Sequence, residues 1–145
     1  MNFKSSITTC FIKKYANFSG RASRSEYWFF YLFFFIFYIV SMALVFVFSF
    51  YFFWLWVVFA IGIIVPSFSV AARRLHDVNK SGWFQLLPLP SVVLMELFEK
   101  SNEIASGLFA LLTTGLYIYL FIQYVSHGDK KNNRFGKNPY GKKKR

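Results

Sequence analysis

The sequence has few acidic residues and almost no cysteine. Its 145 residues include six Asp and Glu against 17 Lys and Arg, so the formal net charge is +11. The single cysteine, Cys10, excludes an internal disulfide framework and a metal site built from several cysteines. Charge of either sign is absent from Tyr27 to Ala72. A soluble domain of this length could not bury so long an apolar stretch, whereas a bilayer accommodates it.

The composition is that of a membrane protein. Hydrophobic residues make up 56% of the chain, aromatic residues make up 23%, and 21 residues are Phe. The first long apolar run begins near Tyr27 and exceeds the hydrophobic core of a signal peptide. We therefore expect the first span to act as an uncleaved anchor.

Four apolar segments predict an all-α membrane protein with short loops, a four-span helical bundle. As a helix the charge-free stretch would be about 70 Å long, enough for two crossings of a core about 30 Å thick. The turn between these crossings is expected near Ser49–Phe53. The third segment is short and contains Pro88 and Pro90, which interrupt a helical hydrogen-bond ladder. The expected spans are 27–48, 52–72, 83–98 and 104–125.

Local patterns mark further features of these segments. Ser23 and Glu26 have the spacing of a capping box, in which each side chain bonds the other residue's backbone N–H. Gly107 and Gly115 are expected to be close-contact points between helices. For residues 1–18 two interpretations stay open: a short helix in the headgroup layer, because aromatic residues recur at helical spacing, or a partly ordered tail.

The distribution of basic residues predicts the topology. Of the 17 Lys and Arg, 16 lie in three clusters at Lys4–Arg24, Arg73–Lys80 and Lys130–Arg145, and Lys100 is the exception. If all four segments cross, the three clusters share one side, in agreement with the positive-inside rule. We therefore expect a membrane domain over 1–125, a basic cytoplasmic tail over 126–145, and both termini in the cytoplasm. A re-entrant third segment is the open alternative.

Three motifs together resemble those of a known family. They are F-S-G-R-A-S-R-S-E-Y-W at Phe18–Trp28, R-R-L-H-D-x-x-x-S-G-W at Arg73–Trp83, and N-R-F-G-x-x-P at Asn133–Pro139. Their order and spacing resemble the domain-of-unknown-function 805 family, small multi-span proteins of bacterial inner membranes. The resemblance implies an inner-membrane location and carries no assigned activity.

In the four-span topology the three motifs meet at the cytoplasmic surface. Arginine offers a planar fork that suits phosphate, and helix N-termini add free N–H groups. We therefore hypothesise a site for an anionic lipid headgroup or another phosphate-bearing ligand. The candidate binding residues are Arg21, Arg24, Arg73, Arg74, His76, Asp77, Trp83, Asn133 and Arg134. The alternative is that Arg73 and Arg74 only anchor the end of a membrane helix.

Catalytic and metal sites have weak support. His76 and Asp77 are adjacent, so they do not face each other on a helix, and no activated Ser or Cys nucleophile accompanies them. Asp77 is more simply expected to neutralise a neighbouring arginine or to cap the following turn. His127 and Asp129 lack zinc-ligand spacing to that pair. No catalytic residue, cofactor or metal is therefore assigned.

The tail motif contains glycines, a proline and aromatic residues, which predicts turns. We expect it to fold back onto Arg73–Trp83, with Phe135 and Tyr140 as apolar contacts. The closing run Lys142–Arg145 is expected to tether the tail to anionic lipid. Nucleic-acid binding is not predicted, because no folded reading module accompanies the basic residues.

Three functions remain as hypotheses. The first is a non-catalytic membrane protein whose cytoplasmic face binds anionic lipid or a protein partner, which includes a second copy of the chain. The second is a small transporter or channel component, although the spans offer no charged pathway apart from Glu96 near one end. The third is a membrane enzyme acting on a lipid phosphate, which predicts that His76 lies with Arg24 and Arg134 in one cavity.

Overall fold

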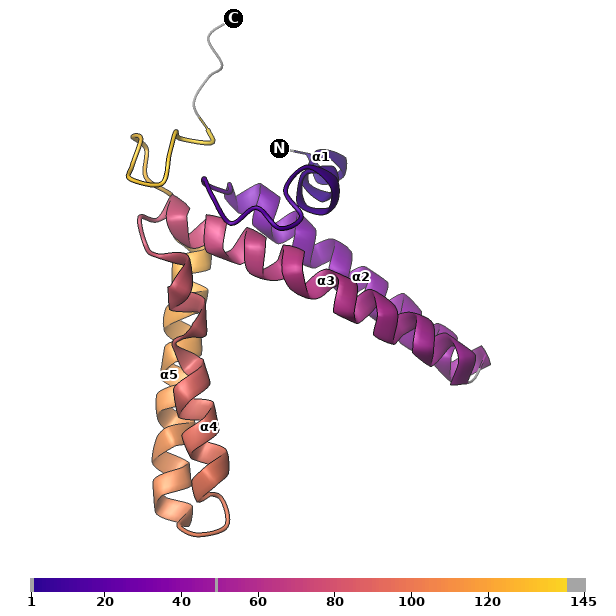
Figure 1. Ribbon diagram of the computed structural model, residues 1–145, viewed down its shortest axis with the longest axis vertical. Helices are drawn as coiled ribbons and strands as arrows, with labels where there is room; N and C mark the ends of the chain where they lie inside the picture. Colours follow the sequence, from indigo (N-terminus) through magenta and orange to yellow (C-terminus); the bar gives the residue numbers. More distant parts are fainter. Residues whose placement is uncertain (1, 49, 141–145) are drawn as a thin grey trace, which may run out of the picture.

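Helices make up most of the described chain, and the segments 14–23 and 126–140 are turns and irregular structure. The structure, a computed structural model, describes residues 2–48 and 50–140, apart from the side chains of residues 47, 48, 50–52 and 55. The elements are α1 (Phe3–Thr8), the π-helical turn η1 (Thr9–Lys13), α2 (Arg24–Phe48), α3 (Phe50–Asp77), the 3₁₀ turn η2 (Gly82–Leu86), α4 (Pro88–Phe98) and α5 (Glu103–Val125). The predicted all-α membrane fold is confirmed, and its helices form two hairpins that diverge from a shared end (Figure 1).

The N-terminal segment is ordered and helical. The Asn2 side chain caps α1 by accepting a hydrogen bond from the Ser5 N–H at 2.9 Å. Phe11 contacts Phe30 and Phe33 of α2, with ring centroids 5.5 and 5.7 Å apart. Of the two interpretations for residues 1–18, the helix is therefore the one observed, packed across the start of α2. Its depth in the headgroup layer stays a prediction.

Residues that follow η1 run along α3 and compensate for its proline. Pro66 has no N–H, so the Gly62 carbonyl one turn earlier lacks its helical donor. The Tyr15 hydroxyl donates to that carbonyl at 2.6 Å. One turn further, the buried Ser69 hydroxyl bonds the main-chain oxygens of Lys14 and Asn17 at 3.1 and 2.7 Å. The N-terminal segment thereby replaces a missing backbone bond and is fixed to α3.

Helices α2 and α3 form the first hairpin, with ends that differ from the predicted ones. Helix α2 begins at Arg24 instead of Tyr27 and ends at Phe48, as expected. Helix α3 begins at Phe50 and continues to Asp77, five residues past the predicted end at Ala72. Ser49, the expected turn residue, lies outside the described residues. The prediction that the span ends before the charged segment is wrong, because its arginines continue the helix.

The second hairpin begins with the segment that contains the two prolines. The Ser81 side chain caps η2 by accepting from the Trp83 N–H at 3.4 Å, so the helical run begins at Gly82, one residue before the expected start of the span at Trp83. Pro88 and Pro90 lie in the first turn of α4, where backbone N–H groups have no helical partner. The predicted interruption of the segment is observed as the division between η2 and α4, and α4 itself is continuous from Pro88. With about 2.0 Å rise in η2 and 1.5 Å in α4, the run from Gly82 to Phe98 is about 27 Å long.

Helix α5 pairs with this run along its length. A buried hydrogen bond of 2.9 Å joins Thr113 to Ser91 of α4, and the rings of Phe98 and Phe109 stack at 5.8 Å. The predicted close-contact glycines do not fit this interface. A Cβ atom added at Gly107 or Gly115 would meet nothing within 4 Å, so that prediction is wrong within the chain.

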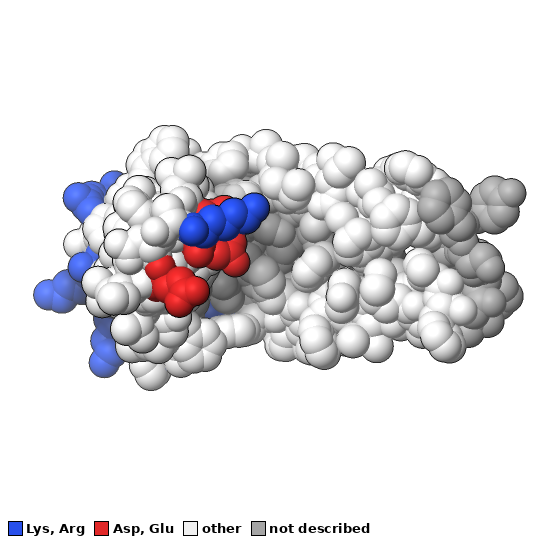
Figure 2. Space-filling model, turned by 90° about the horizontal axis from the view of Figure 1, so that it is seen from below, with Lys and Arg blue, Asp and Glu red and all other residues white. Residues whose placement is uncertain are grey.

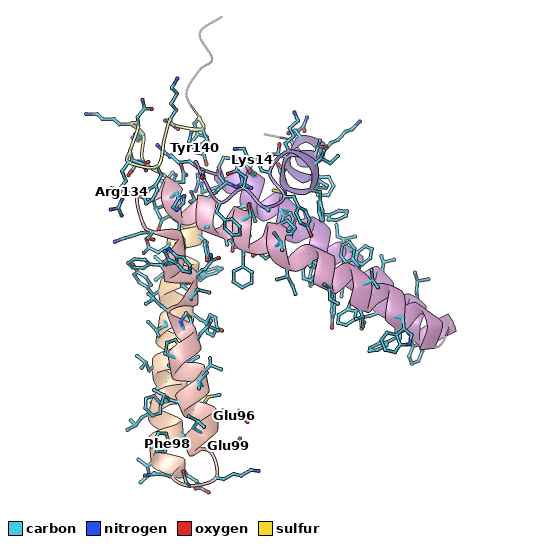
Figure 3. All side chains as sticks on the ribbon, viewed as in Figure 1. Lys14, Glu96, Phe98, Glu99, Arg134 and Tyr140 are labelled. Carbon is cyan, nitrogen blue, oxygen red and sulfur yellow. The ribbon has the colours of Figure 1, made fainter. Side chains whose placement is uncertain are left out.

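Charge and apolar surface are separated along the molecule. Among the described residues, three helices are long and apolar enough to cross a membrane (Arg24–Phe46, Trp56–Asp77 and Glu103–Val125), and Gly82–Phe98 is a shorter apolar run. Figure 2 shows an uncharged flank along the first hairpin. Glu96 and Glu99 lie at the far tip of the second hairpin, whereas Lys14 and Arg134 lie at the shared end (Figure 3). This distribution is the one that a bilayer between the two ends requires.

Candidate functional site at the shared end of the hairpins

Five buried charged residues form an ion-pair cluster where the hairpins meet. We call this cluster the arginine hub, and it consists of Arg21, Glu26, Arg73, Arg74 and Asp77. Arg73 pairs with Glu26, Arg74 pairs with Asp77, and Arg21 pairs with Asp77 at 2.8 Å. Three arginines face two carboxylates, so the hub retains one excess positive charge. Buried charges persist only when paired and hydrogen-bonded, so this cluster fixes the segments that supply it.

Helical geometry sends the two adjacent arginines of α3 to different neighbours. Consecutive residues of an α-helix point about 100° apart, so Arg73 faces the start of α2 while Arg74 faces the end of α5. Asp77 lies three residues beyond Arg74, on the same face, and receives its guanidinium. This confirms the prediction that Asp77 neutralises a neighbouring arginine.

Main-chain carbonyls of the tail complete the coordination of the arginines. Arg74 donates to the carbonyls of Tyr124, at 3.0 Å, and Ser126, at the C-terminal end of α5. Arg21 donates to the carbonyls of Asp129 at 2.5 Å and Lys131 at 2.8 Å. The last carbonyls of a helix have no partner within it, and cations there also complement its dipole. Within the hub, Arg74 therefore caps the C-terminal end of α5, and Arg21 holds the tail that follows it.

Glycine is required where the tail passes the hub. A Cβ atom at Gly128 would overlap the carboxylate of Asp77. At the turn after α3, a Cβ at Gly82 would lie 2.7 Å from that of Ala72. In both places the backbone approaches too closely for any side chain, so the tail and η2 each depend on a single glycine.

The tail motif folds back onto the end of α3, as predicted. The Phe135 ring stacks on the His76 ring with centroids 3.9 Å apart and planes 4° from parallel. The Asn133 amide donates to the His76 carbonyl at 2.9 Å, and the Arg134 guanidinium lies 4.7 Å from the Phe135 ring centroid. Tyr140 accepts from the Arg24 N–H at 2.8 Å. The described part of the tail therefore packs against the shared end of the hairpins.

A cavity of about 660 Å³ lies beside this stack, between α3, η2 and the two terminal segments. Apolar side chains form most of its wall, and His76, Ser81 and Gln85 contribute polar groups. The His76 Nδ1 atom lies 3.0 Å from the Gly20 carbonyl, which orients the ring. The lining residues are Phe18, Ile64, Val65, Phe68, Ala72, His76, Ser81, Gly82, Trp83, Gln85, Leu86 and Phe135.

The predicted site residues divide into two groups. Arg21, Arg73, Arg74 and Asp77 are buried in the hub and engaged with protein groups, so they do not ring the surface as expected. The other five lie outside the hub: His76 and Trp83 line the cavity, Asn133 and Arg134 adjoin it through the tail, and Arg24 begins α2. His76 and Asp77 point to different partners, as their adjacency predicted.

Sequence reasoning missed the main partner of Arg73. Glu26 was expected to bond back to Ser23 in a capping box, but only half of that box forms. The Ser23 hydroxyl accepts from the Glu26 N–H at 3.1 Å, while the Glu26 carboxylate turns to Arg73. One signal was present: Glu26 is the only acidic residue before Asp77, so the neighbouring cations had no other acidic partner within that part of the chain.

Comparison with known proteins places the chain in a family. Inner membrane protein YhaI of Escherichia coli K12 is 26% identical over 129 residues, which cover 88% of this chain and 90% of YhaI. Inner membrane protein YhaH of the same strain is 36% identical over 80 residues, covering 52% of this chain and 66% of YhaH. No solved structure matches the chain. The family model described as "Protein of unknown function (DUF805)" matches residues 15–137, and the chain therefore belongs to the DUF805 family.

Proposed function

We propose that the protein is a non-catalytic inner-membrane protein whose cytoplasmic face binds a phosphate-bearing anionic headgroup in the cavity beside His76. One observation carries the proposal: the cavity is apolar along most of its wall and polar at the end where His76, Phe135 and Arg134 are stacked. Its volume of about 660 Å³ lies in the usual range of small-molecule sites. A ligand with an anionic head and an apolar body matches both parts.

Charge complementarity supports an anionic ligand. The Arg134 guanidinium lies over the Phe135 ring that forms part of the cavity wall, and it is exposed. The hub behind α3 carries one excess positive charge. Arginine binds phosphate oxygens through parallel N–H groups, which makes Arg134 the proposed headgroup contact.

The surroundings of His76 support a binding role over catalysis. Acid–base active sites typically pair two titratable side chains whose environments separate their acid and base roles. Among the described residues lining the cavity, His76 is the one with an ionisable side chain, and its Nδ1 atom lies 3.0 Å from the Gly20 carbonyl. Asp77 is turned into the hub. Transport activity and a protein partner stay predictions, the first testable by ion flux in liposomes.

The distribution of charge supports a cytoplasmic placement of this face. In the sequence, 16 of 17 basic residues fall in the three clusters that the four-span topology assigns to one side, and the positive-inside rule favours the cytoplasm for that side. The opposite tip carries Glu96, Glu99 and Glu103 beside Lys100, all exposed. An inner leaflet rich in anionic lipid would then face the cavity.

Native mass spectrometry of the purified protein with phosphatidylglycerol, and with phosphatidylcholine for comparison, tests the proposal. The variant is Arg134→Gln, because Arg73 and Arg74 are structural and their loss would disturb the hub. Lys100→Gln removes the same charge at the far tip and serves as the matched control. Loss of a charged hydrogen bond of about 1.5–3 kcal/mol predicts at least about tenfold weaker phosphatidylglycerol binding for Arg134→Gln. Equal binding by the wild type and both variants would refute the proposed site.

A further inference from the structure

The cavity beside His76 follows one stripe of α3. Four of its α3 residues, Ile64, Phe68, Ala72 and His76, are spaced four apart and form a continuous ridge that winds slowly around the helix. Twelve residues at 1.5 Å rise span about 18 Å. One leaflet of the hydrocarbon core is about 15 Å thick, half of about 30 Å. The stripe is therefore as long as a leaflet, with its polar end at His76 and its apolar end toward the middle of the span.

A second cavity, of about 460 Å³, is lined by residues of both hairpins. Phe68 and Gln85 line both cavities. On α3, Ala71 borders the second cavity and Ala72 borders the first, so the two lie on neighbouring faces of the helix. Phe68 and Gln85 thus form a partition with an apolar space on each side. The remaining walls of the second cavity come from Tyr31, Ser67, Tyr117, Leu120, Phe121 and Tyr124.

We infer that the ligand is a diacyl phospholipid that straddles this partition, and the inference rests on the function proposed above. Its headgroup lies beside His76 and Arg134, one acyl chain follows the α3 stripe, and the other chain occupies the second cavity. Gln85, at the partition, carries amide N–H donors that suit the ester carbonyls where the two chains diverge. A soluble phosphate compound would use only the polar end and leave both apolar spaces unfilled.

The number of chains is testable by competition. Purified full-length protein in one detergent is titrated with dioleoyl phosphatidylglycerol, with oleoyl lyso-phosphatidylglycerol and with glycerol 3-phosphate, followed by native mass spectrometry. An acyl chain that moves from detergent into the cavity gains no hydrophobic free energy, so the second chain is favoured only by its van der Waals contacts with the protein. The expected preference for the diacyl over the monoacyl lipid is therefore modest, about threefold or more. Glycerol 3-phosphate should not displace the diacyl lipid. Equal binding of the diacyl and monoacyl lipids would overturn the inference.

Variants at the second cavity test where the additional chain lies. Ser67→Phe fills that space and should lower diacyl binding to the monoacyl level while leaving monoacyl binding unchanged. Tyr117→Trp enlarges a half-exposed side chain in the same wall and should also lower diacyl binding. It replaces Ser67→Phe as the test if Ser67→Phe does not fold. Ile61→Phe is the matched control, since Ile61 is exposed on α3 and lines neither cavity. An unchanged diacyl preference in folded Ser67→Phe or Tyr117→Trp would overturn the inference.

The Arg134→Gln variant separates the two levels of failure. If it weakens both phosphatidylglycerol species equally and no chain preference exists, the headgroup site stands and the diacyl inference fails. If it weakens neither species, the proposed function itself fails.

Discussion

Replacing Asp77 by Asn should be the most damaging neutral substitution in the arginine hub. The carboxylate of Asp77 pairs with both Arg21 and Arg74, and all three side chains are fully buried. Removing one partner of a buried pair costs about 3–5 kcal/mol, because an uncompensated charge stays behind. Asp77→Asn leaves two such charges and should reach at least the upper part of that range. Glu26→Gln leaves only Arg73 and should fall in the lower part.

The assay is thermal unfolding in detergent, with Asp129→Asn as the matched control. Asp129 is also an aspartate at the hub, but Arg21 contacts its main-chain carbonyl, and its carboxylate accepts from the Asn133 amide at 3.0 Å. At about 2–4 °C for each kcal/mol, Asp77→Asn should lower Tm by about 10 °C or more and Asp129→Asn by only about 2–4 °C. Similar Tm values for the two variants would refute the view that Asp77 holds the hub together.

Three further predictions concern single contacts. Gly128→Ala should destabilise the protein by more than about 2 kcal/mol in thermal unfolding, because the added Cβ would overlap the buried carboxylate of Asp77. The control Gly115→Ala places its Cβ in open space and should be neutral or stabilising by up to about 1 kcal/mol. Tyr15→Phe should cost about 1 kcal/mol, and much less in a Pro66→Ala background, because alanine restores the backbone donor that the hydroxyl replaces; additive effects in this double-mutant cycle would contradict that explanation. Burial raises the pKa of the Cys10 thiol to about 11, and the nearby carboxylate of Glu26 contributes in the same direction. The stability that the neutral thiol contributes is therefore fully present below the ordinary pKa of 9.0 and is lost as the pH rises to about 11. Maleimide labelling of Cys10 in the folded protein should therefore remain slow at pH 8, and rapid labelling there would contradict its burial.

The helices were largely predictable from the sequence because apolar length and local capping decide them. The errors have identifiable causes. Helix α3 continues to Asp77 because Arg73 and Arg74 are good helix formers and find buried partners there. By contrast, the interruption predicted at Pro88 and Pro90 is observed as the division between η2 and α4, and at the start of α4 their missing N–H groups cost little.

The site was predictable only in outline. The return of the tail onto α3 followed from its aromatic residues, and Phe135 does stack on His76. The hydrogen bonds that Arg21 and Arg74 donate to main-chain carbonyls were not predictable, because every residue carries a carbonyl and the sequence does not single one out. The second cavity, which is lined by residues of both hairpins, depends on packing between distant segments and has no local sequence signal either.

The central claim is that both hairpins cross the membrane from one shared cytoplasmic end. In a Cys10→Ala background, cysteines at Ser101, at the tip of the second hairpin, and at Lys130, in the tail, test it most directly; both positions are exposed. A membrane-impermeant maleimide added to intact spheroplasts should label the cysteine at position 101, and should label the one at position 130 only after the membrane is disrupted. Labelling of position 130 in intact spheroplasts, or protection of position 101, would contradict the account.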